Sequence, residues 1–262
     1  MGSPTYKIKG LILKRTKLGE SDVICSILSE RGSQIRAVAK GARKPSSSLS
    51  SRLEMFSSCE LLLAKGKTLD IIKEAGLLES NAQLRSNLSL TEAASPMVEL
   101  LDRATLDSLD NDKLYPLTLK ALGALCLKHD NSSSALTITA AHLLKTVSFL
   151  GFKPQLEECI GCGNTEELTQ AIQSGKSVAF SYLDGGLVCT HCRSLFEMQW
   201  VHPLVLHWAQ VLLYSTFEQI ETYQLDTDMQ HSLLRFLQSW IKIHIGYSLK
   251  SLTYVFSYGL QD

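Results

Sequence analysis

Two pairs of cysteines, each with two residues between its members, constrain this chain more than any other feature. The pairs are Cys159 with Cys162 and Cys189 with Cys192, and 26 residues separate one pair from the other. Two residues between thiolates allow both sulfurs to point at one cation, and two such turns make a closed tetrahedral shell. We therefore predict one structural Zn²⁺ ion held by these four cysteines, with no coordination position left open for catalysis.

The segment between the pairs is longer than the roughly 15–20 residues usual for this motif. A β-hairpin with strands at 178–182 and 186–188 and a turn at 184–186 would account for the extra length. The alternatives are four unliganded thiols or a redox-active pair, although neither pair lies in the βαβ context of redox motifs. His191 could replace one cysteine as a ligand, but we expect it to be an exposed bystander.

The remaining cysteines, Cys25, Cys59 and Cys126, are isolated in the sequence. We expect them to be buried as small apolar side chains. The total of seven is odd, which argues against a framework made only of disulfides.

Positive charge is concentrated at the start of the chain, although the formal net charge of the whole is zero. Residues 1–52 carry eleven Lys and Arg against three Asp and Glu, a net charge of +8, whereas residues 53–262 carry −8. This asymmetry predicts a polyanionic partner at the basic end; the alternative is that the cations only solubilise a small β domain. The candidate phosphate-binding residues are Lys7, Lys9, Lys14, Arg15, Lys17, Arg31, Arg36, Lys40, Arg43, Lys44 and Arg52.

The same basic region has the pattern of a small β-barrel. Five short strands are predicted, at 6–16, 22–28, 34–40, 59–64 and 69–73, with loop chemistry at 41–51. Five short strands in this length favour the OB-fold, a small barrel that often binds nucleic acid. Residues 1–80 contain only two aromatic side chains, so we expect contact with phosphates rather than stacking on bases.

From about residue 81 the apolar residues recur at helical spacing. One helix is predicted to stop at Gly151 and Pro154, and two more are predicted at 203–220 and 226–245, the last capped by Asp226 or Asp228. Residues 155–198 lack helical periodicity and form an insert. The expected helical core residues near the C-terminus are Trp208, Leu212, Leu233, Leu237, Trp240 and Ile241.

The predicted fold class is α+β, with an N-terminal five-stranded OB-fold barrel and an all-helical C-terminal domain that carries a zinc-ribbon-like insert. The predicted domains are 1–80 (barrel), 81–154 (first helical part), 155–198 (zinc module) and 199–262 (second helical part).

Catalytic motifs are missing from the sequence. The segment 66–68 (GKT) resembles the end of a P-loop, but the earlier glycine is replaced by Leu61 and a strand rather than a helix follows. The nucleophile-elbow, zincin, dinucleotide-binding and zinc-deaminase patterns are also absent. We therefore predict a protein that is not an enzyme.

No apolar run approaches the ~20 residues that span a bilayer, and the first residues do not resemble a signal peptide. We expect a cytoplasmic protein without a membrane partner.

Several segments together resemble the RecO family of bacterial recombination mediators, in the same order along nearly the whole chain. The segments are GLILKRTKLGESD at 10–22, LSERG at 28–32, AKGAR at 39–43, LGFKP at 150–154, CIGCG at 159–163, GGLVCTHC at 185–192 and LKS at 249–251.

This resemblance implies a DNA repair and recombination function, with binding to single- and double-stranded DNA and annealing of complementary strands near the nucleoid. It implies partnership with RecR and with the acidic tail of the single-stranded-DNA-binding protein, so that RecA can load. Reversing the charge of Arg36, Lys40 and Arg43 together should then weaken DNA binding without unfolding the protein. The alternatives are an RNA-binding or transcription-associated protein with the same two modules, a nuclease with a diffuse site, and an adaptor that binds only proteins.

Overall fold

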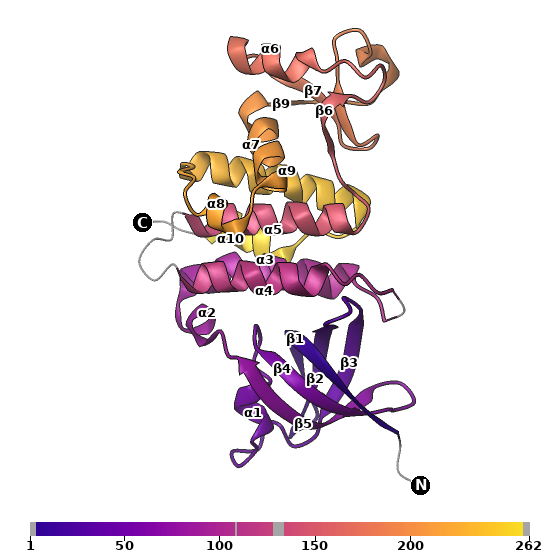
Figure 1. Ribbon diagram of the computed structural model, residues 1–262, viewed down its shortest axis with the longest axis vertical. Helices are drawn as coiled ribbons and strands as arrows, with labels where there is room; N and C mark the ends of the chain where they lie inside the picture. Colours follow the sequence, from indigo (N-terminus) through magenta and orange to yellow (C-terminus); the bar gives the residue numbers. More distant parts are fainter. Residues whose placement is uncertain (1–3, 108, 128–133, 259–262) are drawn as a thin grey trace. The chain divides into compact units, whose positions relative to one another are not determined.

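The computed structural model describes residues 4–107, 109–127 and 134–258, and the chain divides into two compact units, Met1–His129 and Asp130–Asp262 (Figure 1). The helices that follow the barrel as far as residue 127 belong to the first unit. The finer division predicted at 80/81, 154/155 and 198/199 stays a prediction.

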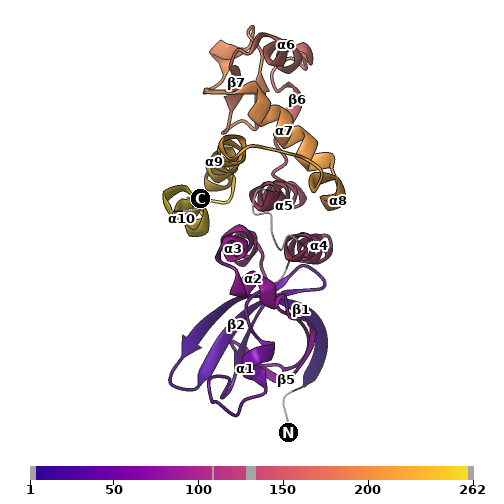
Figure 2. The same cartoon turned by 90° about the vertical axis from the view of Figure 1, so that its left-hand side faces the viewer.

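The first unit is built on a closed five-stranded barrel, which confirms the predicted OB-type fold (Figure 2). The strands are β1 (Thr5–Leu18), β2 (Asp22–Ser29), β3 (Gln34–Ala39), β4 (Ser58–Ala64) and β5 (Asp70–Glu79). The barrel closes in the order β1-β2-β3-β5-β4, with β3 and β5 parallel and the other pairs antiparallel.

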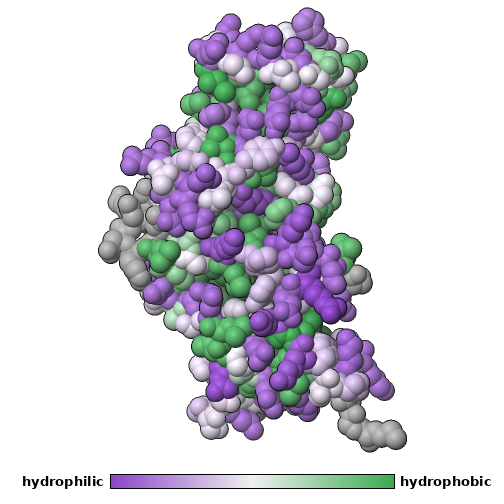
Figure 3. Space-filling model, in the orientation of Figure 1, coloured by the Kyte–Doolittle hydropathy of each residue, from purple (hydrophilic) through white to green (hydrophobic). Residues whose placement is uncertain are grey.

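Alternation of side chains along the strands decides which of them fill the barrel. Ile12, Ile27 and Leu61 point inward and are fully buried, together with Cys25 and Cys59, as expected for these two cysteines. A bulge between Ile12 and Lys14 shifts the alternation along β1 by one residue, so that Arg15 rather than Lys14 lies opposite the core residue Cys25. On the outer face that Figure 3 presents, hydrophobic and hydrophilic side chains are interleaved rather than gathered into one apolar patch.

Four helices accompany the barrel: α1 (Leu49–Arg52), α2 (Ala82–Ser86), α3 (Leu88–Ala104) and α4 (Leu114–Cys126). Helix α3 packs on β1 and β2 and buries the outer side chains Leu11 and Leu28. Cys126 lies at the end of α4 and is only half-buried, unlike the burial expected for it.

The second unit contains helices α5 (Ala135–Phe149), α7 (Pro203–Tyr214), α8 (Phe217–Ile220), α9 (Thr227–His244) and α10 (Lys250–Tyr258). Asp226 caps α9 by accepting a hydrogen bond from the Met229 amide, as predicted. Gly151 follows α5 with φ +94°, a conformation that favours glycine and ends the helix. The expected core side chains are buried except Trp208, which is half-buried.

The single helix predicted at 203–220 is wrong, because the structure breaks it between Tyr214 and Phe217. Thr216 adopts an extended conformation and forms a capping box with Gln219, which starts α8 as a separate helix. The helical spacing of apolar residues continues across this break in the sequence, so the spacing alone did not predict the break.

The insert forms a four-stranded sheet in the order β6-β8-β7-β9, from β6 (Gln155–Cys159), β7 (Val178–Ser181), β8 (Gly186–Val188) and β9 (Gln199–Val201). The predicted hairpin is confirmed as β7 and β8. The segment contains helix although its sequence lacks helical periodicity: α6 (Glu166–Ser174) lies between the two cysteine pairs, and η2 (Arg193–Leu195) follows the second. Helix α6 buries only Leu168 and Ala171, too few residues to give a visible apolar period.

The insert packs on α9 through aromatic side chains. Phe180 of β7 lies 5.2 Å from Phe236 and 5.9 Å from Trp240, measured between ring centroids. Trp240 also donates its indole N–H to the Phe152 carbonyl at 2.9 Å. These contacts join the cysteine-bearing sheet to the helices of the same unit.

Among the helices of the described segments, none is both long and apolar enough to cross a membrane.

Candidate metal centre and nucleic-acid interface

The four cysteines of the two pairs come together at one end of the insert's sheet. Cys159 ends β6 and Cys189 follows β8, two strands that run parallel and side by side. The four sulfur atoms all lie within 4.8 Å of one another, and those of Cys162 and Cys189 are 3.5 Å apart. Bond lengths of ~2.3 Å in a tetrahedral zinc–sulfur shell place the sulfurs roughly 3.8 Å apart, so this spacing fits one ion.

Tight turns after each first cysteine bring the sulfurs inward. The Gly163 amide donates to the Cys159 carbonyl at 2.9 Å, and the Cys192 amide donates to the Cys189 carbonyl at 3.0 Å. Gly161 sits so close to the second pair that an added Cβ would lie 3.0 Å from the Cys192 sulfur. The two glycines therefore give the first turn the room that its geometry needs.

Main-chain amides favour the thiolate form of Cys159. Burial disfavours the charged form, but the N–H groups of Cys189 and Gly161 point at the Cys159 sulfur and outweigh it, lowering its pKa to about 6. Thiolate is the form that binds a metal.

Four thiols with this spacing can hold a metal ion. Cys159, Cys189 and Cys192 are buried and Cys162 is exposed. Few apolar side chains support them, chiefly Ala179 and Val188 with Phe196 packed alongside. His191 is exposed and lies outside the cluster, as expected of a bystander.

The eleven cations predicted to meet phosphates are divided among several parts of the barrel. Two of them, Lys14 and Arg36, lie on the outer face of the barrel in one cross-strand row, Lys14–Ser26–Arg36. Lys14 is 3.3 Å from the Asp102 carboxylate of α3, whereas Arg36 is exposed and makes no ion pair with any described residue. Strands 2 and 3 form the face that OB-folds use for oligonucleotides.

Four more of the predicted cations gather beside the β1–β2 turn: Lys17, Lys40, Arg43 and Lys44. Arg43 donates to the carbonyls of Gly19 and Glu20 at 3.1 and 2.9 Å, which ties the loop after β3 to this turn. Asp22 accepts from the Gly41 amide and the Ser21 hydroxyl, and these bonds, with Lys40 and Lys44 nearby, lower the pKa of Asp22. The loop is therefore held where Lys40 and Lys44 flank β3.

Lys65 and Lys67, in the β4–β5 turn, complete this side of the barrel and were missed from the sequence. Both line a pocket of about 250 Å³ together with Arg36 and the carboxylates Asp70 and Asp107. The signal was the pair of lysines in the predicted turn Lys65-Gly66-Lys67 between the fourth and fifth strands. We define the cationic face as Lys17, Arg36, Lys40, Arg43, Lys44, Lys65 and Lys67.

Asp70 holds the β4–β5 turn in shape. It is buried, accepts a hydrogen bond from the Gly66 amide at 3.0 Å and a short one from the Tyr6 hydroxyl, and lies 3.6 Å from the Lys65 ammonium. Burial opposes ionisation, but these partners together lower the pKa of Asp70. Gly66 has no space for a side chain, because an added Cβ would lie 1.9 Å from the Leu69 carbonyl oxygen.

Replacing Gly66 with alanine is expected to destabilise the protein by roughly 1–3 kcal/mol, because the Leu69 backbone must move and strain the turn. Gly123→Ala is the matched control: no atom lies within 4 Å of an added Cβ at this helical site, so a gain of about 1 kcal/mol is expected. Urea unfolding of both variants measures the difference. Equal stabilities would show that the turn tolerates a side chain.

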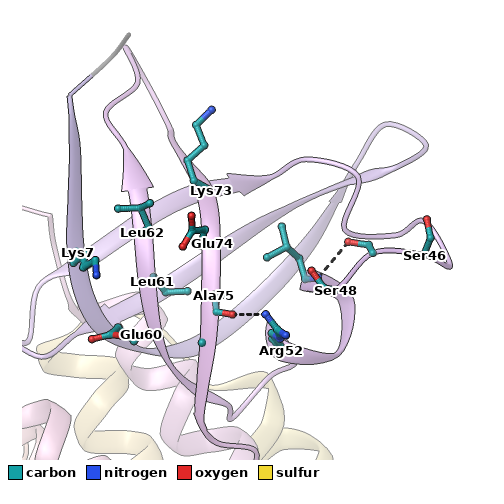
Figure 4. Close-up of a pocket in the computed structure, with 13 residues that line it drawn as sticks. Lys7, Ser46, Ser48, Arg52, Glu60, Leu61, Leu62, Lys73, Glu74 and Ala75 are labelled. Atoms are coloured by element: carbon teal, nitrogen blue, oxygen red, sulfur yellow. Dashed lines mark hydrogen bonds between the residues drawn. The ribbon is translucent and has the colours of Figure 1, made fainter.

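The other predicted cations lie away from the cationic face. Lys7 and Arg52 line a groove of about 670 Å³ across β4 and β5, where Glu60 and Glu74 mix negative charge with the positive (Figure 4). Arg52 donates to the Ala75 carbonyl at 2.9 Å. Lys9 faces Glu60 on β4.

Arg15 pairs closely with Glu54, and Arg31 lies in the β2–β3 turn, where its carbonyl accepts from the Asn111 amide. The structure thus brings together about half of the predicted set and separates the rest.

Neither aromatic side chain of the barrel is placed to stack on a base. Phe56 is fully buried, and Tyr6 is half-buried with its hydroxyl bound to Asp70. The cationic face therefore offers charge without an aromatic platform.

The barrel and the four-cysteine cluster define an OB-fold protein with an inserted module whose four cysteines could hold a metal ion. Two family models match: "Recombination protein O N terminal" over residues 1–81 and "Recombination protein O C terminal" over residues 85–253. The chain belongs to the recombination protein O (RecO) family, and its role lies in DNA repair and recombination.

Curated relatives agree with this assignment. The chain is similar to "DNA repair protein RecO" of Desulfitobacterium hafniense, with 30% identity over 250 residues, covering 94% of this chain and 87% of the relative. The protein of the same name from Alkaliphilus metalliredigens is 29% identical over 241 residues, covering 91% and 93%. That of Bifidobacterium longum is 27% identical over 251 residues, covering 94% and 97%.

Proposed function

We propose that this protein binds single- and double-stranded DNA through the cationic face and promotes annealing of complementary strands without catalysis. The observation that carries the proposal is the placing of seven Lys and Arg along β3. Arg36, Lys65 and Lys67 line a pocket near its start, and Lys17, Lys40, Arg43 and Lys44 lie near its end, beside the β1–β2 turn. Membership of the RecO family indicates that the polyanion bound by these cations is DNA. The barrel's lack of an exposed aromatic platform favours contact with the backbone, which is tolerant of sequence.

The mechanism is neutralisation of charge. Two DNA strands repel each other because each is a dense line of phosphates, and Lys and Arg that replace counterions on one strand reduce this repulsion. Arg36, Lys40 and Lys44 are exposed side chains that can reach phosphates without breaking a main-chain bond. No ATP is needed, since the step is binding rather than bond cleavage.

The metal is proposed to be one Zn²⁺ ion, held by Cys159, Cys162, Cys189 and Cys192. Four thiolate ligands are the usual donor set of structural zinc, and zinc would crosslink β6 to β8 where the apolar core is small. The proposed domain division is the barrel at 1–80, helical parts at 81–154 and 199–262, and the zinc module at 155–198.

The proposed partners follow from the family and not from any contact in the structure. They are RecR and the acidic tail of the single-stranded-DNA-binding protein, and through them RecA, which loads onto the released strand. The proposed location, cytoplasmic and near the nucleoid, follows from the same membership.

Annealing of two complementary oligonucleotides tests the function directly. The protein is expected to accelerate duplex formation equally with and without ATP, and to leave the strands intact when Mg²⁺ is added. For contact with about four to six phosphates, the log–log dependence of affinity on salt should have a slope of roughly −3 to −5. A flat salt dependence, loss of DNA integrity, or preference for structured RNA in competition would contradict the proposal.

A further inference from the structure

A second candidate contact lies on the zinc module, in a groove of about 650 Å³ between α6, β9 and the second cysteine pair. The groove is lined mainly by polar and charged side chains, among them Lys176, Arg193 and Glu167. Its one large aromatic side chain is Trp200. No part of the metal-binding or barrel sites uses these residues.

Trp200 is unusually accessible for a tryptophan. It lies on β9, an edge strand of the sheet, with 54% of its surface exposed. The two other tryptophans are Trp208, which is half-buried, and Trp240, which is buried. An exposed indole in a groove offers a flat face on which another planar group can stack.

Arg193 is held against this indole. Its guanidinium carbon lies 4.6 Å from the centre of the Trp200 ring, and its Nη2 atom is 3.4 Å from the Glu167 carboxylate. Thr190 donates a hydrogen bond to the same carboxylate at 2.9 Å. The Nε atom of Arg193 is buried and finds no acceptor among the described residues. The guanidinium is thus held between the Glu167 carboxylate and one face of the Trp200 ring.

The zinc module has an exposed aromatic side chain beside cations, whereas the barrel has cations without an exposed aromatic side chain. Aromatic faces that bind unpaired bases in nucleic-acid-binding proteins work together with cations that contact the neighbouring phosphates. On the barrel the cations are present, but Phe56 is buried and Tyr6 is engaged by Asp70. On the zinc module Trp200 is exposed, with Arg193 and Lys176 beside it in the groove.

We propose that the groove on the zinc module binds single-stranded DNA by stacking one unpaired base on Trp200, with Arg193 and Lys176 facing the adjoining phosphates. The inference rests on the proposed function, in that the ligand is DNA. It goes beyond that function because it assigns recognition of unpaired bases to the zinc module. Duplex DNA keeps its bases stacked on one another, so the groove should distinguish single strands from duplexes.

The test compares Trp200→Ala, Trp200→Phe and the wild-type protein on oligo-dT, on a matched duplex and on an abasic strand of equal length. Trp200→Ala is expected to lower affinity for oligo-dT roughly 5- to 100-fold and to leave duplex affinity within about twofold. Trp200→Phe should restore part of the loss, because phenylalanine keeps a stacking face. On the abasic strand the variants should bind alike.

Leu195→Ala is the matched control, since Leu195 is an exposed apolar side chain of the same module that does not line the groove. Metal content and the unfolding midpoint should be the same for all variants. In the wild-type protein, oligo-dT should also quench the fluorescence of the exposed tryptophan, and Trp200→Phe should lose this signal.

Unchanged affinity of Trp200→Ala for oligo-dT, or equal loss on oligo-dT and duplex, would overturn the inference. These outcomes leave the proposed function standing as long as variants of the cationic face lose DNA binding. Failure of the proposed function appears differently, as DNA binding that is indifferent to the barrel cations.

Discussion

Changing Arg36, Lys40 and Lys44 together to glutamate is expected to weaken binding to duplex DNA roughly 100-fold at low salt. Each side chain is exposed on the cationic face, and each lost phosphate contact removes about 1 kcal/mol and about one unit of the salt slope. The sequence pointed to Arg43 in place of Lys44. Arg43 is the poorer choice, because its hydrogen bonds to the Gly19 and Glu20 carbonyls hold the loop after β3. If Arg43 were changed, a loss of DNA affinity could come from a disturbed loop instead of a lost phosphate contact.

The control for this triple variant is Lys7→Glu, Lys9→Glu and Lys73→Glu, which changes the net charge by the same amount on the β1–β4–β5 side. The control should lose only a few-fold in affinity, through the general change in charge. Fluorescence anisotropy at several salt concentrations measures both variants, with urea unfolding to confirm that they fold. Equal losses in the two variants would mean that binding depends on net charge and not on the cationic face.

Changing Cys189 to serine is expected to release the metal and unfold the zinc module. Cys189 is buried, its sulfur is 3.5 Å from that of Cys162, and its amide donates to the Cys159 sulfur. Apparent binding free energies of structural zinc in small domains are roughly 10–16 kcal/mol, far more than the few apolar contacts of this module can replace. A strong chelator should have the same effect on the wild-type protein.

Cys126→Ser serves as the matched control, because Cys126 is a half-buried thiol of α4 outside the cluster. It should keep one zinc per chain and nearly the wild-type unfolding midpoint. Zinc stoichiometry by mass spectrometry and thermal unfolding followed by circular dichroism measure both variants. A Cys189→Ser protein that retained full zinc, or that lost zinc without loss of stability, would contradict a structural role for the metal.

Local patterns were sufficient to predict the strands of the barrel and to single out the four cysteines that the structure brings together. Successive side chains of a strand face opposite sides of the sheet, so apolar and polar residues alternate in the sequence, and all five strands were predicted from this pattern. Each cysteine pair was recognised from the two residues between its members, a spacing that lets both sulfurs point at one ion. Helix α6 was not predicted, because it buries too few residues to show an apolar period. The break before Phe217 was not predicted either, because it depends on a capping box within an apolar stretch.

The sequence by itself determined the fold class, the two cysteine pairs and the excess of cations in residues 1–52, because composition, period and spacing are properties of neighbouring residues. Only the tertiary structure decided which cations share a face. Barrel closure separates Lys7 and Lys9 from Arg36, brings in Lys65 and Lys67 from the β4–β5 turn, and pairs Lys14 with Asp102. Likewise, Trp200 and Arg193 acquire a joint surface only through folding of the module. Charge and stacking act through space, so their arrangement depends on how distant segments meet.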